Sequence, residues 1–269
     1  MLNKWYPQNM DTLYGGFLTE FTYDFKPTSN QDKFIVTQAR HTWSTSKAAM
    51  RYPGVTYYKT LAQNGYKFLH DVMWDKTYGG FYTMVDRKGN VIDSTKNAYG
   101  NAFGIYALAA YCKLSNDPNA LSFAQEAFMW LEKHSHDPVH KGYYQHMQRR
   151  RHADTKNCKH CLQLLKQDTK IKTVLFICSK HLQNYMLSGQ TTLLRERLHE
   201  MLLLIRDTMI GNKGYLTLFF QPDWTPVSIR DSSDAYIMAH HGLDYVSFGH
   251  NVETSYLLLE ASHTLKHTK

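Results

Sequence analysis

The sequence lacks the long apolar segments and the cysteine pattern that mark membrane proteins and disulfide-stabilised proteins. Its 269 residues contain no run of about 18 apolar residues, and the start, MLNKWYPQNMD, has no apolar stretch behind a basic one. Only four cysteines occur, and Cys158, Cys161 and Cys178 lie in one segment, which leaves Cys112 alone. We therefore expect a cytoplasmic globular protein with no membrane partner and no disulfide framework.

Most of the chain also lacks an excess of charge of either sign. The formal net charge is +8, which would ordinarily suggest an acidic partner such as nucleic acid. Residues 149–192 hold nine Lys or Arg and two acidic residues, whereas the other 225 residues hold 22 basic and 21 acidic groups. Because the positive charge belongs to a single segment, no nucleic-acid partner is expected for the protein as a whole.

A short motif recurs along the chain, in which an acidic or amide residue is followed by glycine and an aromatic residue. With Gly16, Gly80, Gly142 and Gly214 as reference points, the spacings are 64, 62 and 72 residues. Glycine at these positions predicts tight turns, and the alternating aromatic residues that follow predict short half-buried strands. The near-constant spacing indicates an internal repeat.

Helical patterns fill the sequence between these motifs. Residues 98–112 are apolar nearly all round, as in a helix that is buried on most sides. A helix start follows at 116–118, where Asn116 or Asp117 can cap and Pro118 suits the first turn. Further helices are predicted at 193–209 and 249–265. Two helices and a hairpin in about 60 to 70 residues predict an all-α solenoid or toroid.

Several strings identify a family that the chain resembles. They are YGGF at 14–17, QARHTWSTSKAA at 38–49, YGGFYTMVDRKGN at 78–90, KNAYGNAFGIYALAAY at 96–111, WLEKHSHDP at 130–138 and SFGHNVETSYLLLEAS at 247–262. Together they resemble the N-acylglucosamine 2-epimerase and cellobiose 2-epimerase family. The resemblance implies an all-α (α/α)6 barrel of helix pairs. Four hairpin motifs in place of six imply one incomplete domain over residues 1–269, with about four of the six repeats.

The family chemistry, interconversion of sugars epimeric at C2, sets clear requirements. A proton is removed beside the open-chain carbonyl, an enediolate is stabilised, and a proton returns to the opposite face. His250 and Glu253 are three residues apart and so share one face of a predicted helix start. The resemblance implies that His250 is one of two proton-transfer bases and that Glu253 assists ring opening. Asn251 stands where the family commonly has Asp.

Three further residues match the family's sugar pocket. The resemblance implies that Arg40 holds the sugar oxygens near C1 and C2, where a guanidinium stabilises the developing negative charge. Tyr99 matches a tyrosine that donates to a sugar hydroxyl, and Trp43 either stacks on a sugar face or packs in the core. No role is assigned to the histidines His41, His134, His136, His240, His241 and His263. The chemistry implies no cofactor, and the expected partner is a sugar or disaccharide substrate.

Residues 149–192 do not fit the family pattern, and we interpret them as an out-of-frame, poorly packed segment. With one plausible codon choice, reading 166–190 one nucleotide earlier gives ETGYKDQNSSIHLLEAFTELYAVWP, whose histidine resembles another pocket residue of the family. In the printed frame His181 is a poor replacement for it. Two alternatives rest on this segment alone: half of a zinc site at Cys158 and Cys161, and a phosphate-binding patch at 149–151.

The sequence therefore predicts a sugar 2-epimerase or isomerase whose own activity is impaired. The alternative is an inactive fragment that at most binds sugar. The string around His250 leans toward the cellobiose and mannobiose branch of the family.

Overall fold

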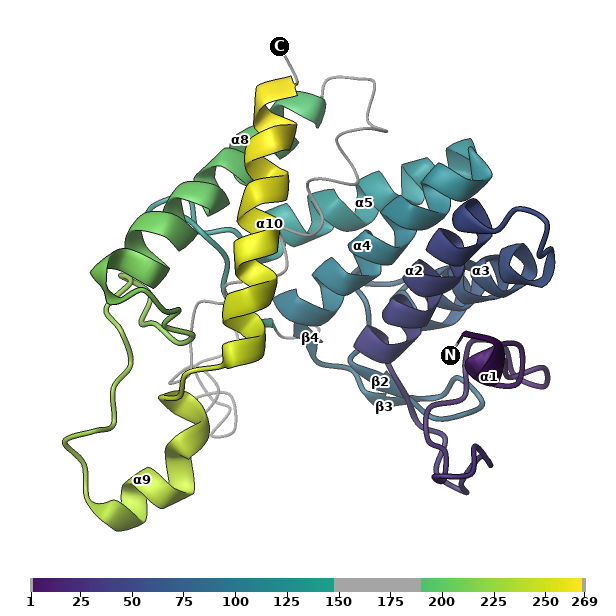
Figure 1. Cartoon of the computed structure of the whole chain (residues 1–269), viewed down its shortest axis with the longest axis horizontal. Helices are drawn as coiled ribbons and strands as arrows, with labels where there is room; N and C mark the ends of the chain where they lie inside the picture. The colour runs from purple at the N-terminus through teal and green to yellow at the C-terminus, as the bar shows by residue number, and fades with distance from the viewer. Residues whose placement is uncertain (1, 148–189, 268–269) are drawn as a thin grey trace. The chain divides into compact units, whose positions relative to one another are not determined.

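The computed structural model describes residues 2–147 and 190–267, which are mostly helical (Figure 1). The chain divides into two compact units. Unit 1 contains residues 2–133, and unit 2 contains residues 134–147 and 190–267. The segment predicted to be out of frame lies outside the described residues except for 190–192, which begin a helix.

Unit 1 is built around three helices that pack side by side. Helix α2 contacts both α3 and α4 along its length (Figure 1). Strands β1, β2 and β3 form a small antiparallel sheet in that order, with an irregularity between Met84 and Val85. In chain order the elements are α1 (Leu2–Trp5), β1 (Lys33–Phe34), α2 (Ile35–Arg51), α3 (Tyr57–Phe68), a π-helical turn (Leu69–Met73), β2 (Met84–Val85), β3 (Val91–Asp93), β4 (Lys96–Asn97), α4 (Ala98–Ser115) and α5 (Pro118–Ser135).

The boundaries of α4 and α5 follow from local sequence, and both predicted helices are confirmed. Helix α4 is buried along nearly its whole length, as its all-round apolar character predicted. It ends where Asn116 adopts a left-handed conformation with φ 54°, which asparagine tolerates better than most residues. Helix α5 begins at Pro118, and the Asp117 carboxylate accepts the N–H of Asn119 at 2.9 Å. Asn116 thus ends one helix and Asp117 caps the next.

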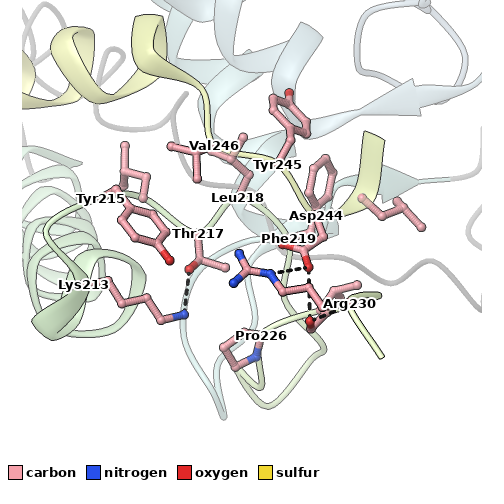
Figure 2. A pocket seen from close by; sticks show the side chains of 14 residues that line it. Lys213, Tyr215, Thr217, Leu218, Phe219, Pro226, Arg230, Asp244, Tyr245 and Val246 are labelled. Carbon is pink, nitrogen blue, oxygen red and sulfur yellow. Dashed lines mark hydrogen bonds and ion pairs between the residues drawn. The ribbon is translucent and has the colours of Figure 1, made fainter. Parts of the chain in front are cut away.

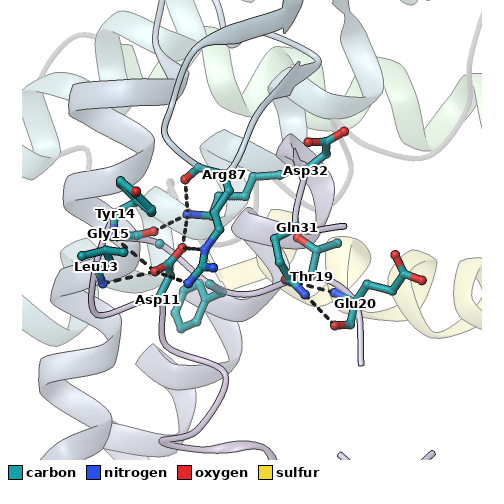
Figure 3. Close-up of polar contacts among 12 residues, drawn as sticks. Asp11, Leu13, Tyr14, Gly15, Thr19, Glu20, Gln31, Asp32 and Arg87 are labelled. Atoms are coloured by element: carbon teal, nitrogen blue, oxygen red, sulfur yellow. Dashed lines mark hydrogen bonds and ion pairs between the residues drawn. The ribbon is translucent and has the colours of Figure 1, made fainter. Parts of the chain in front are cut away.

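The first three glycine motifs fold into the same turn. In the first, the Asp11 carboxylate accepts the N–H groups of Leu13 and Tyr14, at 3.1 and 3.2 Å (Figure 3). The backbone N–H of Asp11 also donates to the carbonyl of Gly16 at 3.0 Å. The same carboxylate and backbone contacts recur around Asp75 and Asp137. These repeated contacts confirm that the motif is a structural unit.

The prediction of short strands after these glycines is confirmed in part: β2 (Met84–Val85) follows Gly80 and β5 (His146–Met147) follows Gly142, but the aromatic residue next to each glycine forms only a single bridge. A side-chain amide from a helix takes the place of a neighbouring strand. The N–H of Phe17 donates to Oε1 of Gln38 at 2.8 Å, and Nε2 of Gln38 donates to the Phe17 carbonyl at 2.8 Å. Asn101 of α4 accepts the N–H of Phe81 in the same way, also at 2.8 Å.

Unit 2 packs α8 against α10 (Figure 1). The helix predicted at 193–209 is confirmed in position but changes from α to π geometry at Leu204, and the helix predicted at 249–265 is α10. The fourth glycine motif forms a 3-10 turn instead of the turn seen at the first three. The elements are β5 (His146–Met147), α8 (Gln190–Leu203), a π-helix (Leu204–Ile210), 3-10 turns (Gly211–Lys213 and His241–Leu243), α9 (Asp234–His240) and α10 (Phe248–His267).

A buried histidine and carboxylate fix the third glycine motif within unit 2. Nε2 of His136 lies 2.9 Å from Oε1 of Glu200, and the same oxygen accepts the N–H of Gly142 at 3.0 Å. Burial alone would raise the pKa of Glu200, but the contacts with His136 and Gly142 lower it. His136 thus has a structural partner.

Across the described part of the chain, no helix combines the length and apolar character needed to cross a bilayer.

Candidate functional site

Helices α2 and α4 bring Arg40, Trp43 and Tyr99 to a shared cluster of aromatic rings in unit 1. The exposed Arg40 guanidinium lies 4.8 Å from the centre of the Phe103 ring, within the range of a cation–π interaction. The ring of Tyr99 is 4.9 Å from the same Phe103 ring and meets it edge-on. Because Phe103 is only 4% exposed, it forms a fixed base beneath Arg40 and beside Tyr99.

Trp43 lies one turn after Arg40 on α2 and stacks on Tyr106 of α4. The two rings are 5.1 Å apart and nearly parallel, with 17° between their planes. The ammonium of Lys47 lies 5.7 Å from the Trp43 ring. The indole N–H of Trp43 is buried, and among the described residues no group accepts its hydrogen bond. When a ligand oxygen accepts a hydrogen bond from such a buried donor, the free energy of ligand binding becomes more favourable.

His41, the neighbour of Arg40, contacts a different set of rings. Its Nδ1 lies 2.9 Å from the Tyr6 hydroxyl, and the His41 ring is 5.0 Å from that of Phe17. Burial lowers the pKa of His41 to about 4, so the imidazole is neutral at pH 7. A neutral ring held between the Tyr6 hydroxyl and the Phe17 ring is a packed structural group.

His250 and Glu253 lie in the first two turns of α10, in unit 2. Oγ of Ser247 accepts the backbone N–H of His250 at 3.3 Å, which caps the start of the helix. The His250 side chain is half-buried, and that of Glu253 is exposed. The predicted spacing of three residues is therefore realised on one helix, close to its N-terminus.

Asn251, the departure from the family pattern, has a structural role. Its Oδ1 accepts the N–H of Leu216 at 3.0 Å, and this hydrogen bond holds the loop after the fourth glycine motif against α10. Gln38 and Asn101 do the same for the first two motifs. The contact needs only an acceptor oxygen, which Asp and Asn both carry. The substitution is therefore compatible with the position of His250 beside it.

Two residues of the unit 1 cluster were not predicted from sequence. Phe103 and Tyr106 stand four and seven positions after Tyr99, and this spacing puts all three on one face of a helix. That pattern was available in the sequence, but the all-round apolar character of α4 gave no reason to prefer this face. Both residues are now assigned to the cluster by their contacts with Arg40 and Trp43.

The alternatives based on the basic segment fall outside what the structure describes. Within residues 2–147 and 190–267, no group of three or more His, Cys, Asp or Glu side chains is placed to hold a metal ion. The zinc alternative at Cys158 and Cys161, the phosphate patch at 149–151 and the comparison with His181 all lie outside the described residues.

Comparison with known proteins places these features in a family. The model of the N-acylglucosamine 2-epimerase (GlcNAc 2-epimerase) family matches residues 15–269. A cellobiose 2-epimerase from Bacteroides fragilis is 28% identical over 98% of this chain and 63% of its own length. A D-mannose isomerase from Thermobifida fusca is 31% identical over a shorter stretch, 36% of this chain and 25% of its own length.

Solved structures give the same result for the fold. The cellobiose 2-epimerase of Spirochaeta thermophila superposes with a TM-score of 0.77 at 27% identity, covering 98% of this chain and 61% of that one. A D-mannose isomerase at 16% identity shares the fold with a TM-score of 0.68, covering 98% of this chain and 65% of that one. The chain thus spans a little over three fifths of the length of these relatives. By the family match over residues 15–269, the chain belongs to the N-acylglucosamine 2-epimerase family.

Proposed function

We propose that this chain binds the reducing-end sugar of a disaccharide and exchanges its C2 proton, as an impaired member of the sugar 2-epimerases. The observation that supports the proposal most directly is the Arg40 cluster. It combines a guanidinium held over Phe103, the Tyr99 ring and a buried indole N–H of Trp43 in need of an acceptor. Sugar hydroxyl and carbonyl oxygens are acceptors for all three kinds of donor.

The chemistry assigns each residue a separate task. The Arg40 guanidinium holds O1 and O2 of the open-chain sugar and stabilises the negative charge of the enediolate. His250 takes the proton from C2 and gives it back, since imidazole exchanges protons readily near neutral pH. Glu253 assists ring opening. Tyr99 and Trp43 orient the sugar through its hydroxyl groups. Proton transfer of this kind involves no cofactor.

We infer impaired epimerisation from the number of proton-transfer bases that these residues supply at C2. His250 serves one face of C2, whereas inversion needs a second acid on the opposite face. The family resemblance places a further pocket histidine in the frame-shifted version of 166–190, and the printed sequence has Phe176 and Ile177 at that point. A single base removes and returns the proton on the same side. We therefore propose that exchange at C2 outpaces inversion.

The decisive experiment follows cellobiose incubated with the purified chain in D2O. Loss of the C2 proton signal by NMR reports exchange, and the appearance of the C2 epimer reports inversion. We expect slow exchange with little epimer, and we expect His250→Asn to abolish the exchange. Arg51→Met, at the exposed end of α2, is the matched control and should leave the exchange rate unchanged.

The outcomes separate the alternatives. Epimer formed as fast as the exchanged sugar would show that the chain is not impaired. Cellobiose binding without exchange would favour the second candidate, a sugar-binding fragment, which is motivated by the atypical segment 149–192. Failure to bind cellobiose, mannobiose and N-acetylmannosamine alike would overturn the proposal. The first two sugars are expected to bind better than the third, because the string around His250 is nearer to the disaccharide branch.

We also propose that the helix pairs belong to an incomplete toroid of the (α/α)6 type. The repeated turns at Asp11, Asp75 and Asp137 support this arrangement, because the turn at Asp11 precedes the pair α2 and α3, and those at Asp75 and Asp137 follow the pairs α2–α3 and α4–α5. Small-angle scattering of the purified chain tests the proposal. An extended profile with two separated masses would contradict a shared toroid.

A further inference from the structure

Unit 2 contains a cavity that the epimerase chemistry does not use. It has a volume of about 160 Å³ and lies between three segments, residues 213–219, 226–230 and 243–246 (Figure 2). None of the predicted site residues lines it. The segments are fixed to each other and to α10 by hydrogen bonds, including the one from Leu216 to Asn251 at 3.0 Å. The cavity is thus formed by segments that hydrogen bonds hold in place within unit 2.

Hydrogen-bond donors from two of these segments face the same space. Nζ of Lys213 donates to Oγ1 of Thr217 at 3.4 Å, and the Arg230 guanidinium and the Tyr215 hydroxyl lie beside them (Figure 2). Contacts with the Tyr215 hydroxyl and with the Asp244 carboxylate raise the pKa of Arg230. Like any arginine, Arg230 is a cation, and its guanidinium offers five N–H groups.

The one carboxylate in the lining is already engaged by the protein. Oδ2 of Asp244 accepts Oγ–H of Ser228 at 3.1 Å and the N–H of Ile229 at 3.3 Å, and it lies 3.4 Å from Nε of Arg230. Its side chain is only 16% exposed, whereas that of Arg230 is 68% exposed. The lining thus carries two cations against one carboxylate that serves to anchor the loop. The remaining positive charge favours an anionic ligand.

The rest of the lining is apolar and aromatic. The rings of Phe219 and Tyr245 lie 6.2 Å apart, and Leu218, Pro226 and Val246 complete the wall. Flat apolar walls of this kind suit the C–H faces of a pyranose ring, and the polar groups at the edge suit an acidic substituent. A site for inorganic phosphate alone would not need such walls.

We propose that this cavity binds an acidic sugar, with its carboxylate or phosphate group on Lys213 and Arg230 and its ring against Phe219 and Tyr245. The ligand class is a hexuronic acid or a sugar phosphate, which share an oxyanion on a pyranose. None of the residues proposed for the epimerase function lines this cavity, so acidic-sugar binding is tested with substitutions that leave those residues unchanged.

Isothermal titration calorimetry of the full chain tests the proposal with four probes: glucuronate, glucose 6-phosphate, glucose and inorganic phosphate. Both acidic sugars should bind at least about tenfold more tightly than glucose, because only they carry an oxyanion that pairs with the cations Lys213 and Arg230. Their relative affinities decide between carboxylate and phosphate. The affinity should fall as salt is raised, because the donors are exposed cations. Equal binding of glucose would overturn the proposal.

Substitutions of the two cations in the cavity test whether the acidic sugar binds there. Lys213→Met and Arg230→Met should each weaken binding of the preferred acidic sugar about tenfold. Arg206→Met removes an equally exposed cation, paired with Asp207 elsewhere in unit 2, and should have no effect. Circular dichroism and thermal melts identify any variant that fails to fold, and Lys213→Gln is a second, milder test. An unchanged affinity in both cavity variants, or inorganic phosphate binding as tightly as glucose 6-phosphate, would contradict the proposal.

Discussion

The ammonium of Lys33 lies 2.9 Å from the carboxylate of Asp11, and both side chains are completely shielded from solvent. Lys33 also donates to the carbonyl oxygens of Gly15 at 2.7 Å and Arg87 at 3.0 Å. All three N–H groups of the ammonium are therefore satisfied, which is the condition under which a buried charge is tolerated. Lys96 pairs with Asp75 in the same way in the second motif, at 3.0 Å. Charge pairs, rather than apolar packing alone, close these turns.

Lys33→Met should destabilise the protein strongly, because it leaves the Asp11 carboxylate buried with one partner fewer. We expect the free energy of unfolding to fall by about 3 to 5 kcal/mol in urea denaturation. Lys26→Met is the matched control, since Lys26 forms an exposed pair with Asp24 and should cost less than about 1 kcal/mol. Similar losses in the two variants would show that burial of the pair has no energetic consequence.

The Asp11 carboxylate should make the protein sensitive to acid. Burial alone would raise its pKa, but hydrogen bonds from Arg87 and Lys33 lower it to about 2 from 3.8. The unfolded chain therefore takes up this proton first, so about 2 kcal/mol of stability is present above pH 4 and is lost as the pH falls toward 2.

Arg87→Met tests this account, since it removes one of the two cations on Asp11. The variant should be less stable than the parent at pH 5, and the difference between their free energies of unfolding should shrink toward pH 2. Arg51→Met, which leaves Asp11 untouched, should give a curve parallel to that of the parent. A constant difference between Arg87→Met and the parent across this pH range would contradict the assigned role of Arg87.

His41 should titrate far below an ordinary histidine. Burial lowers its pKa from 6.5 to about 4, so the unfolded chain binds the proton first as the pH falls. The resulting loss of stability sets in below pH 6.5 and reaches up to about 3 kcal/mol near pH 4. NMR titration of the histidine ring signals measures this directly. A midpoint for His41 above pH 6 would mean that the ring is more accessible than its contacts with Tyr6 and Phe17 indicate.

Gly80→Ala should be poorly tolerated. Gly80 has φ 74°, and a Cβ there would lie 2.5 Å from the Trp130 ring and 2.8 Å from the Lys96 side chain. The strained backbone and the clash should together lower the free energy of unfolding by about 2 kcal/mol or more. At Gly54 a Cβ would meet nothing within 4 Å, so Gly54→Ala should change stability by less than about 1 kcal/mol. Comparable melting temperatures for the two variants would refute this expectation.

The helices were predictable because their signals are local. The apolar character of 98–112 and the neighbouring Asn116, Asp117 and Pro118 determine where α4 ends and α5 begins. The contacts of the aromatic residues Phe17 and Phe81 were not predictable, because their partners are helical amides about 20 residues away. Nothing near Phe17 in the sequence indicates that Gln38 occupies the position of a neighbouring strand.

The candidate site was predictable only in part, for a similar reason. Family strings located Arg40, Trp43 and Tyr99, but Phe103 joins them through contacts between two helices. The cavity around Arg230 was not predicted at all. It is formed by three loop segments whose residues carry no periodic pattern, and only their tertiary hydrogen bonds bring the cations together.

Phe103→Leu should separate a positioning role from simple core packing. Phe103 supports the Arg40 guanidinium at 4.8 Å, whereas Phe128 of α5 is equally buried and is not part of this cluster. Both Phe103→Leu and Phe128→Leu should cost about 1 to 3 kcal/mol of stability, since each removes part of a buried ring. Only Phe103→Leu should also weaken cellobiose binding and slow C2 exchange, and it should do so much less when Arg40 is already replaced by Met. Equal effects of the two leucine variants on binding, or full additivity of Phe103→Leu with Arg40→Met, would show that Phe103 does not act through Arg40.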